Sequence, residues 1–290
     1  MVKRRGKAIK IELEQQQQQP NEVNAASNAT ETTNKRQSGR KKLKKEDGNE
    51  KPLWQQHLEN LEKIRETKDA PVDTVGCDML GDVLSSPQTY RFQILVSLML
   101  SSQTKDEVTA AAMQRLKARG CTVENILGMD EEELRNLLIP VGFYKVSSWL
   151  YCYHEEIDVQ KKAIYLKKTA SVLKEKYESD IPRSIKELCS LPGVGLKMAN
   201  LTMQHAWDQI EGIGVDTHVH RIANRLGWVK TSTPEQTGAV LEALIPRERW
   251  ATLNKTLVGF GQQTCTPLYP KCSTCLNKDI CPAIGVKKKR

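Results

Sequence analysis

The sequence lacks any long run of apolar residues. Hydrophobic residues make up 39% of the 290, and no stretch approaches the ~20 consecutive apolar residues that a helix needs to cross a bilayer. The longest apolar stretch, residues 94–100, is typical of a buried helix. We therefore expect no membrane span and no membrane partner.

A secretory leader is also missing. The first ten residues are basic and contain no acid, but no apolar core follows them, so no signal peptide is predicted. A basic start without acids leaves a mitochondrial address open. We expect a soluble protein inside the cell.

Strand-like alternation of apolar and polar residues is scarce from Trp54 onward. Apolar residues recur instead at spacings of three and four, which is the period of a helix that buries one face. Turn signals such as Ser85-Ser86-Pro87 separate these segments. The pattern predicts an all-α fold with helices near residues 53–64, 92–100, 108–116, 131–138, 163–177, 185–191, 199–207, 219–226, 237–244 and 250–260.

A basic excess is missing from most of the chain. The formal net charge is +9, but residues 1–52 hold 13 Lys and Arg against 7 Asp and Glu, and the remainder holds 31 against 28. Bulk charge therefore does not indicate nucleic-acid binding by the globular part, which needs a local argument.

Residues 1–52 are poor in apolar side chains and carry a glutamine run at 15–19. Such a segment cannot bury enough surface to offset its ordering entropy, so we predict a disordered basic tail. Its block RKKLKK at 40–45 is typical of nuclear import, and we predict the nucleus as the main location. The alternative is a solvated tail that binds DNA without sequence preference, and both roles can coexist.

Four of the eight cysteines lie within 17 residues of one another near the C-terminus: Cys265, Cys272, Cys275 and Cys281. Their chemistry admits a zinc ion or a [4Fe–4S] cluster, because both take four thiolates. The spacing alone slightly favours zinc, which is the more frequent occupant of such sites, and disulfides are less expected inside the cell. A site at the end of a helical chain, without a redox partner motif, favours a structural role. Lys271 and Lys278 would lie on its loops, ready for phosphates.

The stretch LPGVGLKMAN, residues 191–200, predicts a turn between two helices. Gly193 and Gly195 allow positive φ and close approach of another backbone. The unpaired N–H groups of the turn Pro192-Gly193-Val194-Gly195, in which proline itself has none, and of the new helix would make an anion site, suited to a phosphate of a nucleic-acid backbone. The alternative is a plain helix-turn-helix with a glycine cap.

Lys197 lies where the second of these helices begins. The helix dipole disfavours an ammonium there, and partial burial disfavours it further. A lysine that attacks a carbon must be neutral, and it gains from such a place. We interpret Lys197 as a nucleophile.

Asp216 precedes another predicted helix, in GVDTHVHRIANRLG at 214–227. It could simply cap that helix. Beside a lysine nucleophile it could also stabilise positive charge on a sugar carbon and take the proton of the amine. His218 and His220 are expected to pack and to form hydrogen bonds rather than to catalyse.

These three motifs together resemble the endonuclease III family of DNA glycosylases with lyase activity, in its eukaryotic form. LPGVGLKMAN resembles the family's helix-hairpin-helix with its catalytic lysine, VDTHVHRIANRLG its catalytic-aspartate segment, and C-x6-C-x2-C-x5-C its iron–sulfur spacing. The resemblance covers roughly residues 53–290. It implies catalytic Lys197 and Asp216 and a [4Fe–4S] cofactor on the four cysteines.

The resemblance also implies a two-lobed fold. Residues 84–211 would form a six-helix lobe that carries the hairpin, and residues 53–83 plus 212–290 a second lobe that carries the cluster. DNA would lie across the cleft between them, and the protein is expected to act as a monomer. Within the cleft, Gln103 matches the residue that fills the space of the flipped base, and Phe143 matches an apolar wedge. Without the resemblance, the two would be a helix-end glutamine and a core phenylalanine.

The implied activity is base-excision repair. A damaged base leaves the duplex, Lys197 displaces it through a Schiff base, and β-elimination cuts the strand on the 3′ side. The implied substrates are oxidised or ring-saturated pyrimidines such as thymine glycol, and abasic sites, in double-stranded DNA. The alternatives are a monofunctional glycosylase of the same superfamily, which would lack Lys197, and a helix-hairpin-helix protein that only binds DNA.

Residues 146–160, VSSWLYCYHEEIDVQ, depart from the family pattern as an insertion. Without them the chain would read GFYKKKAIYLKK, which matches the pattern without a gap. The segment keeps the reading frame and has ends that are encodable as splice sites, so a retained short intron is one interpretation and a genuine loop insertion is the other.

Overall fold

The computed structural model describes residues 51–142 and 151–287, with only the backbone described at 151–158. Asn49–Arg290 form one compact unit. The predicted tail lies outside the described residues except for Lys51 and Pro52, and so does Phe143. The predictions for both stay predictions.

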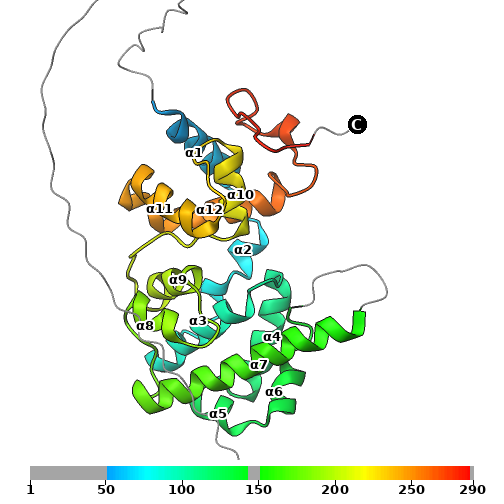
Figure 1. The fold of residues 1–290 in the computed structure, drawn as a ribbon, viewed down its shortest axis with the longest axis vertical. Helices are drawn as coiled ribbons and strands as arrows, with labels where there is room; N and C mark the ends of the chain where they lie inside the picture. Colours follow the sequence, from blue (N-terminus) through cyan, green and yellow to red (C-terminus); the bar gives the residue numbers. More distant parts are fainter. Residues whose placement is uncertain (1–50, 143–150, 288–290) are drawn as a thin grey trace, which may run out of the picture. The chain divides into compact units, whose positions relative to one another are not determined.

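All regular secondary structure in the described ranges is helical, which confirms the predicted all-α fold (Figure 1). No helix among the described residues is long and apolar enough to span a bilayer. The helices are α1 (Leu53–Ile64), α2 (Pro71–Thr74), α3 (Pro87–Leu100), α4 (Asp106–Arg119), α5 (Val123–Gly128), α6 (Glu131–Leu138), α7 (Tyr151–Lys176), α8 (Ile185–Ser190), α9 (Leu196–Ala206), α10 (Thr217–Arg225), α11 (Pro234–Leu244) and α12 (Trp250–Gln263), with short 3-10 helices η1 (Cys77–Met79), η2 (Arg247–Arg249) and η3 (Cys272–Thr274).

Short polar side chains fix where several helices begin. Ser86 Oγ accepts a hydrogen bond from Thr89 N at 3.2 Å, and Pro87 is the first helical residue of α3. This helix therefore begins before the predicted start at residue 92, because its first turn is polar and capped rather than apolar. Thr122 and Ser184 cap α5 and α8 in the same way. Each such cap contributes about 1 kcal/mol.

Helix α7 also begins earlier than predicted, and residues 151–160 of the proposed insertion form its first turns (Figure 1). No glycine or proline stands between residues 146 and 176, so nothing in the sequence stops the helix there. The helix contacts α3, α5 and α6. Its described part buries Val159, Ala163, Leu166 and Leu173.

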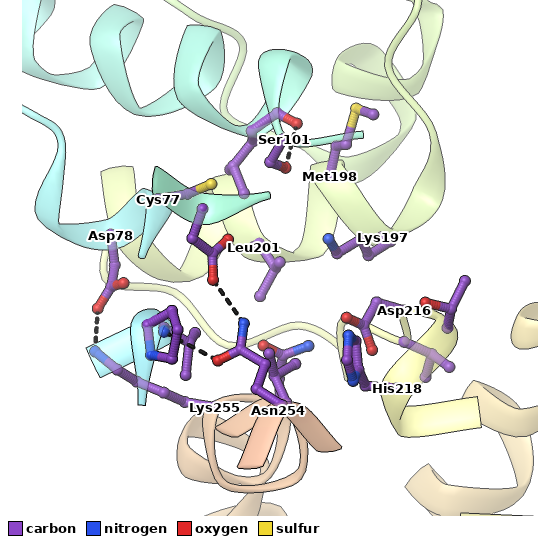
Figure 2. A pocket seen from close by; sticks show the side chains of 18 of the residues that line it. Cys77, Asp78, Ser101, Lys197, Met198, Leu201, Asp216, His218, Asn254 and Lys255 are labelled. Atoms are coloured by element: carbon purple, nitrogen blue, oxygen red, sulfur yellow. Dashed lines mark hydrogen bonds and ion pairs between the residues drawn. The ribbon is translucent and has the colours of Figure 1, made fainter. Parts of the chain in front are cut away.

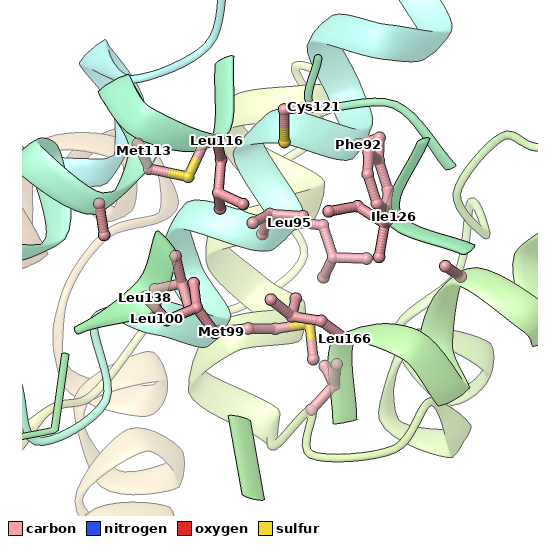
Figure 3. Close-up of a cluster of buried hydrophobic side chains, with 14 of the residues drawn as sticks. Phe92, Leu95, Met99, Leu100, Met113, Leu116, Cys121, Ile126, Leu138 and Leu166 are labelled. Atoms are coloured by element: carbon pink, nitrogen blue, oxygen red, sulfur yellow. The ribbon is translucent and has the colours of Figure 1, made fainter. Parts of the chain in front are cut away.

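A first apolar cluster lies among α3 to α9 (Figure 3). Helix α3 is its centre, since every residue from Phe92 to Leu100 is buried. Leu95 of α3, Leu116 of α4 and Leu166 of α7 are almost fully buried together. Truncating such a leucine to alanine costs about 2–5 kcal/mol.

A second apolar cluster joins distant parts of the sequence. Leu58 and Leu61 of α1 pack with residues of α10, α11 and α12 between Ile213 and Phe260. Two linked hydrogen bonds run through this cluster. Trp228 Nε1 donates to His57 Nδ1 at 3.0 Å, and His57 Nε2 donates to Ile280 O at 3.2 Å. Burial lowers the pKa of His57, in agreement with a neutral ring in this role.

Polar contacts join the two clusters. Lys255 Nζ of α12 donates to Asp78 Oδ2 at 2.7 Å, and Gln204 Nε2 of α9 donates to Ala251 O at 2.8 Å. Asp78, Gln204, Ala251 and Lys255 of these contacts also line a cavity between the clusters. The predicted lobe boundaries, at residues 83/84 and 211/212, stay predictions.

Candidate functional site

The predicted hairpin lies between α8 and α9. Gly193 has φ +78°, which favours glycine, and Val194 N donates to Leu191 O at 3.1 Å to close the turn. Tyr165 of α7 lies against Gly193, where an added Cβ would come within 2.9 Å of the ring. Thr169 Oγ1 donates to Pro192 O at 3.1 Å. Two side chains of α7 therefore hold the turn in place.

Gly195 differs from the prediction of positive φ. It is the N-cap of α9 with φ −102°, so any residue could adopt its backbone conformation. An added Cβ there would meet no atom within 4 Å. The fold itself does not require glycine at this position, and the space is available for a ligand that approaches the backbone.

The start of α9 presents unpaired amides. Its first helical hydrogen bond runs from Ala199 N to Gly195 O at 2.9 Å. Within the described chain the amides of Leu196, Lys197 and Met198 therefore donate to no carbonyl. Amides in this arrangement attract an anion such as a phosphate.

Lys197 lies in the first turn of α9, where the sequence predicts it, and is half-buried. Figure 2 shows its ammonium pointing into a cavity. Its charge acts on three groups of that cavity, because it contributes to the pKa of Cys77, Asp106 and His218. No acidic side chain stands in the first turn of α9 to balance it.

Asp216 is the N-cap of α10, and its Oδ1 accepts a hydrogen bond from Val219 N at 2.8 Å. The capping interpretation is therefore right for one oxygen. The second oxygen makes no hydrogen bond within the described part of the chain. Asp216 also lines the cavity that Lys197 enters (Figure 2), so the site combines one amine and one carboxylate from two helix starts.

The cavity has a volume of about 1020 Å³. It lies where the two apolar clusters meet, with α9, α10, α12 and the η1 segment around it (Figure 2). Leu201 and Met198 supply apolar wall, and Asp78, Asn254 and Lys255 supply polar wall. A space of this size and mixed polarity can hold a nucleotide-sized group.

His218 follows Asp216 and lines the cavity. Its ring lies so close to Gly261 of α12 that a Cβ there would come within 2.4 Å of Nδ1. Burial lowers its pKa, while Asp216 and Asp106 act in the opposite direction. His220 Nδ1 lies 2.7 Å from Thr237 Oγ1, so this ring forms a hydrogen bond as predicted.

Asp106 is a cavity residue that sequence reasoning missed. It is the first residue of α4, and Gln262 Nε2 of α12 donates to its Oδ2 at 2.7 Å. Burial raises the pKa of its carboxyl, and the Gln262 bond opposes this rise. The partners are 156 positions apart, so no local sequence pattern could have indicated the pair.

Gln103 is exposed and lies in the loop between α3 and α4. Its φ is +53°, which is uncommon for a residue with a side chain. It lines the main cavity and also a smaller one beside Gly193 and Tyr165. The prediction that it contacts DNA is compatible with this place, whereas Phe143 lies outside the described residues.

The four clustered cysteines line one small cavity. Cys265, Cys275 and Cys281 pack against the second apolar cluster, and Cys272 is exposed. Burial raises the pKa of the Cys275 and Cys281 thiols, and the neighbouring thiols raise it further. Metal binding would have to displace these protons.

Basic side chains surround this cysteine loop. Arg225 Nη1 of α10 donates to Cys265 Sγ at 3.4 Å and to Thr266 O at 2.7 Å. Lys271 is exposed at the rim of the cysteine cavity. The exposed ammonium is available for a phosphate, as the sequence suggests.

Proteins with similar sequences and structures identify the family of this chain. The sequence pattern of the HhH-GPD superfamily base excision DNA repair proteins matches residues 96–148 and 153–247. The break between the two matches falls inside the proposed insertion at 146–160.

The chain is 53% identical over 232 residues to endonuclease III-like protein 1 of Mus musculus, across 79% of this chain and 72% of that protein. It is 52% identical to the Gallus gallus protein of the same name, across 79% and 77%. Among solved structures, a non-covalent endonuclease III–DNA complex matches with TM-score 0.63 and 26% identity, over 79% of this chain and 95% of that one. A trapped endonuclease III–DNA covalent intermediate matches with TM-score 0.64 and the same identity and coverage. The chain belongs to the endonuclease III family of the HhH-GPD superfamily.

Proposed function

We propose that this protein is a DNA glycosylase and abasic-site lyase that removes oxidised or ring-saturated pyrimidines, such as thymine glycol, from double-stranded DNA. The observation that carries the proposal is that Lys197 and Asp216 line one cavity, each at the start of a helix. A monofunctional glycosylase does not need the amine, and a protein that only binds DNA needs neither group.

The relatives support the lysine's role. One matched structure is a trapped covalent intermediate of endonuclease III with DNA. A covalent bond requires a nucleophile, and the described cavity holds a half-buried amine whose helix lacks acidic neighbours in its first turn.

Excision begins when the damaged nucleotide leaves the base stack and enters the cavity, at a cost of a few kcal/mol that is lower for a poorly stacked lesion. The amine of Lys197 attacks C1′ of the sugar, so that an N–C1′ bond forms while the glycosidic bond breaks. The base leaves with the electron pair and takes up a proton. The free oxygen of Asp216 stabilises positive charge on the sugar and accepts the proton of the amine.

Strand cleavage follows from the Schiff base. Once the sugar ring opens, the imine carbon makes the C2′ protons acidic. Loss of a C2′ proton expels the 3′ phosphate oxygen, and the strand is cut on the 3′ side. Water then hydrolyses the imine and frees Lys197. The amides at the start of α9 are suited to hold a backbone phosphate during these steps.

The four cysteines fit a [4Fe–4S] cluster, which would supply a structural cross-link of the C-terminal loop. All four thiols line one cavity, which is compatible with a group that takes four thiolates, and the spacing C-x6-C-x2-C-x5-C resembles the iron–sulfur spacing of the family.

Borohydride trapping tests the proposal. The full-length protein, incubated with thymine-glycol duplex and borohydride, should become linked to DNA, because borohydride reduces a Schiff base to a stable amine. Lys197→Gln should abolish trapping while binding of the duplex persists. Excision without trapping by the wild type would indicate a monofunctional enzyme, and binding alone would indicate a DNA-binding protein.

A further inference from the structure

Lys162 of α7 holds the loop that carries Gln103. Its Nζ donates to Leu100 O at 2.7 Å, to Ser102 O at 2.6 Å and to Thr104 Oγ1 at 3.1 Å. These oxygens stand on both sides of Gln103. The ammonium is half-buried, so the bonds form in an environment where they are stronger than in water.

Lys162 lies at the C-terminal end of α3, where carbonyl oxygens need hydrogen-bond donors. The last carbonyls of a helix have no partner within it and carry the negative end of the helix dipole. Ser101 Oγ donates to Leu98 O at 2.9 Å and Ser102 Oγ donates to Met99 O at 3.4 Å. The carbonyl of Leu100, the last helical residue, is taken by Lys162.

Thr104 extends the network. Its hydroxyl donates to Ser102 O at 3.0 Å and accepts from Gly142 N at 3.0 Å as well as from Lys162. One donor and two acceptor sites are all that a hydroxyl offers, so Thr104 is fully used. Lys162 thus ties α7 to the Gln103 loop and, through Thr104, to Gly142.

Gln103 needs such support. A residue with a side chain stays in the left-handed region only where its surroundings fix it there. Gln103 is itself exposed at the edge of the cavity, so the fixing has to come from its neighbours in sequence. Lys162 bonds to both of them.

We propose that Lys162 is a positioning residue for lesion recognition: it fixes the backbone on both sides of Gln103, so that this side chain is presented to the duplex in one conformation. This inference rests on the proposed function. It adds a residue that touches neither the substrate nor the catalytic pair.

Lys167 provides a matched control. It lies on the same helix, and its Nζ donates to Leu127 O at 3.3 Å and to Met129 O, at the end of α5. It therefore makes the same kind of bond to a helix end, but neither Lys167 nor its two acceptors line the main cavity or the smaller one beside Gln103.

The test compares Lys162→Met with Lys167→Met in the full-length protein. For Lys162→Met we expect single-turnover excision of thymine glycol from duplex DNA to fall at least about tenfold, because small misplacements near a reaction are costly. Fluorescence of 2-aminopurine opposite the lesion should no longer rise on binding. Trapping on a preformed abasic site in single-stranded DNA should change less than about twofold, because no base pair has to be opened.

Lys167→Met should keep both the excision of thymine glycol and the rise of 2-aminopurine fluorescence, even if its Tm falls as much as that of Lys162→Met. Equal behaviour of the two variants would overturn the inference. Thr104→Val, which removes only the shared hydroxyl, tests the same network if Lys162→Met does not fold, and it should lower excision in the same direction.

Two further measurements do not depend on base excision or strand cleavage. Amide hydrogen exchange in residues 101–104 should accelerate in Lys162→Met and not in Lys167→Met, and affinity for a duplex with a tetrahydrofuran abasic analogue should fall only in the former. If the wild type does not trap, the proposed lyase activity fails while these two readouts still decide on Lys162. If the wild type traps and Lys162→Met matches it in every readout, only the positioning role fails.

Discussion

Helices α9 and α10 begin beside the same cavity with opposite chemistry. Helix α10 begins with Asp216, whose carboxylate caps Val219 N at 2.8 Å and suits the positive end of the helix dipole. Helix α9 begins with Gly195, which offers no side-chain bond, and it places Lys197 where the dipole disfavours a cation. One helix start is built for stability, and the other leaves amides and an amine available for a ligand.

The two helix starts show how stability and function are divided between residues of the same cavity. At α10 the stabilising group also faces the cavity, so a structural and a chemical role coincide in Asp216. At the start of α9 no hydrogen bond or ion pair within the described residues stabilises Lys197, which is the pattern expected where function opposes stability. Substitutions at the two starts should therefore have different consequences.

After Lys197, whose replacement should abolish trapping, the largest effect is expected at Asp216. Asparagine caps a helix as well as aspartate, so Asp216→Asn should lower the Tm only slightly, through the lost interaction of the charge with the helix dipole. Excision of thymine glycol should fall about 100-fold, because the charge is lost. Asp216→Ala should lose the same activity and also about 1 kcal/mol of stability. Single-turnover kinetics and thermal unfolding measure the two parts. A fully active asparagine variant would show that capping is the only role.

The two hairpin glycines should respond in opposite ways. Gly193→Ala forces a side chain into positive φ and against Tyr165, and should cost at least about 1–2 kcal/mol of stability. Gly195→Ala should leave the Tm unchanged, because its φ is ordinary and no atom lies near. If a phosphate approaches there, the methyl group should weaken binding to duplex DNA about tenfold, or 1.4 kcal/mol. If the affinity for duplex DNA is unchanged, no phosphate approaches Gly195.

Asp106 at the start of α4 is a third case at the same cavity. Burial raises the pKa of its carboxyl, so the ionised form is less favourable in the folded than in the unfolded state. Stability from this group is present at low pH and is lost as pH rises through the raised pKa. Asp106→Asn should therefore increase the Tm at neutral pH, with a gain that shrinks as the pH falls. A lower Tm for the variant at neutral pH would contradict this.

The smallest effect is expected from deleting residues 146–160. Gly142 N and Lys162 Nζ both bond Thr104 Oγ1, at 3.0 and 3.1 Å, so their Cα atoms lie within about 14 Å, and the shortened chain can span ~17 Å. Tyr144 would then take the helical place of the buried Val159. The variant should fold, with a Tm change below about 4 °C, and should be more active than the full chain.

Loss of folding or of cleavage in that variant would support a genuine insertion. Transcripts across this point give an independent answer, since the splice interpretation requires a shorter message.

Local patterns predicted most of the fold. The apolar period located the helices, and the bounds of α1 and α6 match the predicted ranges. The start of α7 was not predicted, because the absence of glycine and proline permits a helix at 151–162 without indicating one. The short helix α5 gave too few turns for a period to show.

The candidate site also has a part that local sequence predicts and a part that only the folded chain shows. Lys197 and Asp216 stand out because their types and places are unusual or specific within a few residues. The Asp106–Gln262 and Lys255–Asp78 contacts join residues more than 150 positions apart, and only the folded chain brings them together. The support that Lys162 gives to Gln103 depends on three acceptors from another helix end, which no spacing in the sequence encodes.

The second apolar cluster has a consequence for how the chain matures on the ribosome. Leu58 and Leu61 are made about 150 residues before Ile213, which is the next fully buried apolar residue of this cluster along the chain. At ~5–20 residues per second, α1 emerges roughly 8–30 s before the helices that cover it. The nascent protein must therefore keep an amphipathic segment in solution while the cluster around α3 assembles.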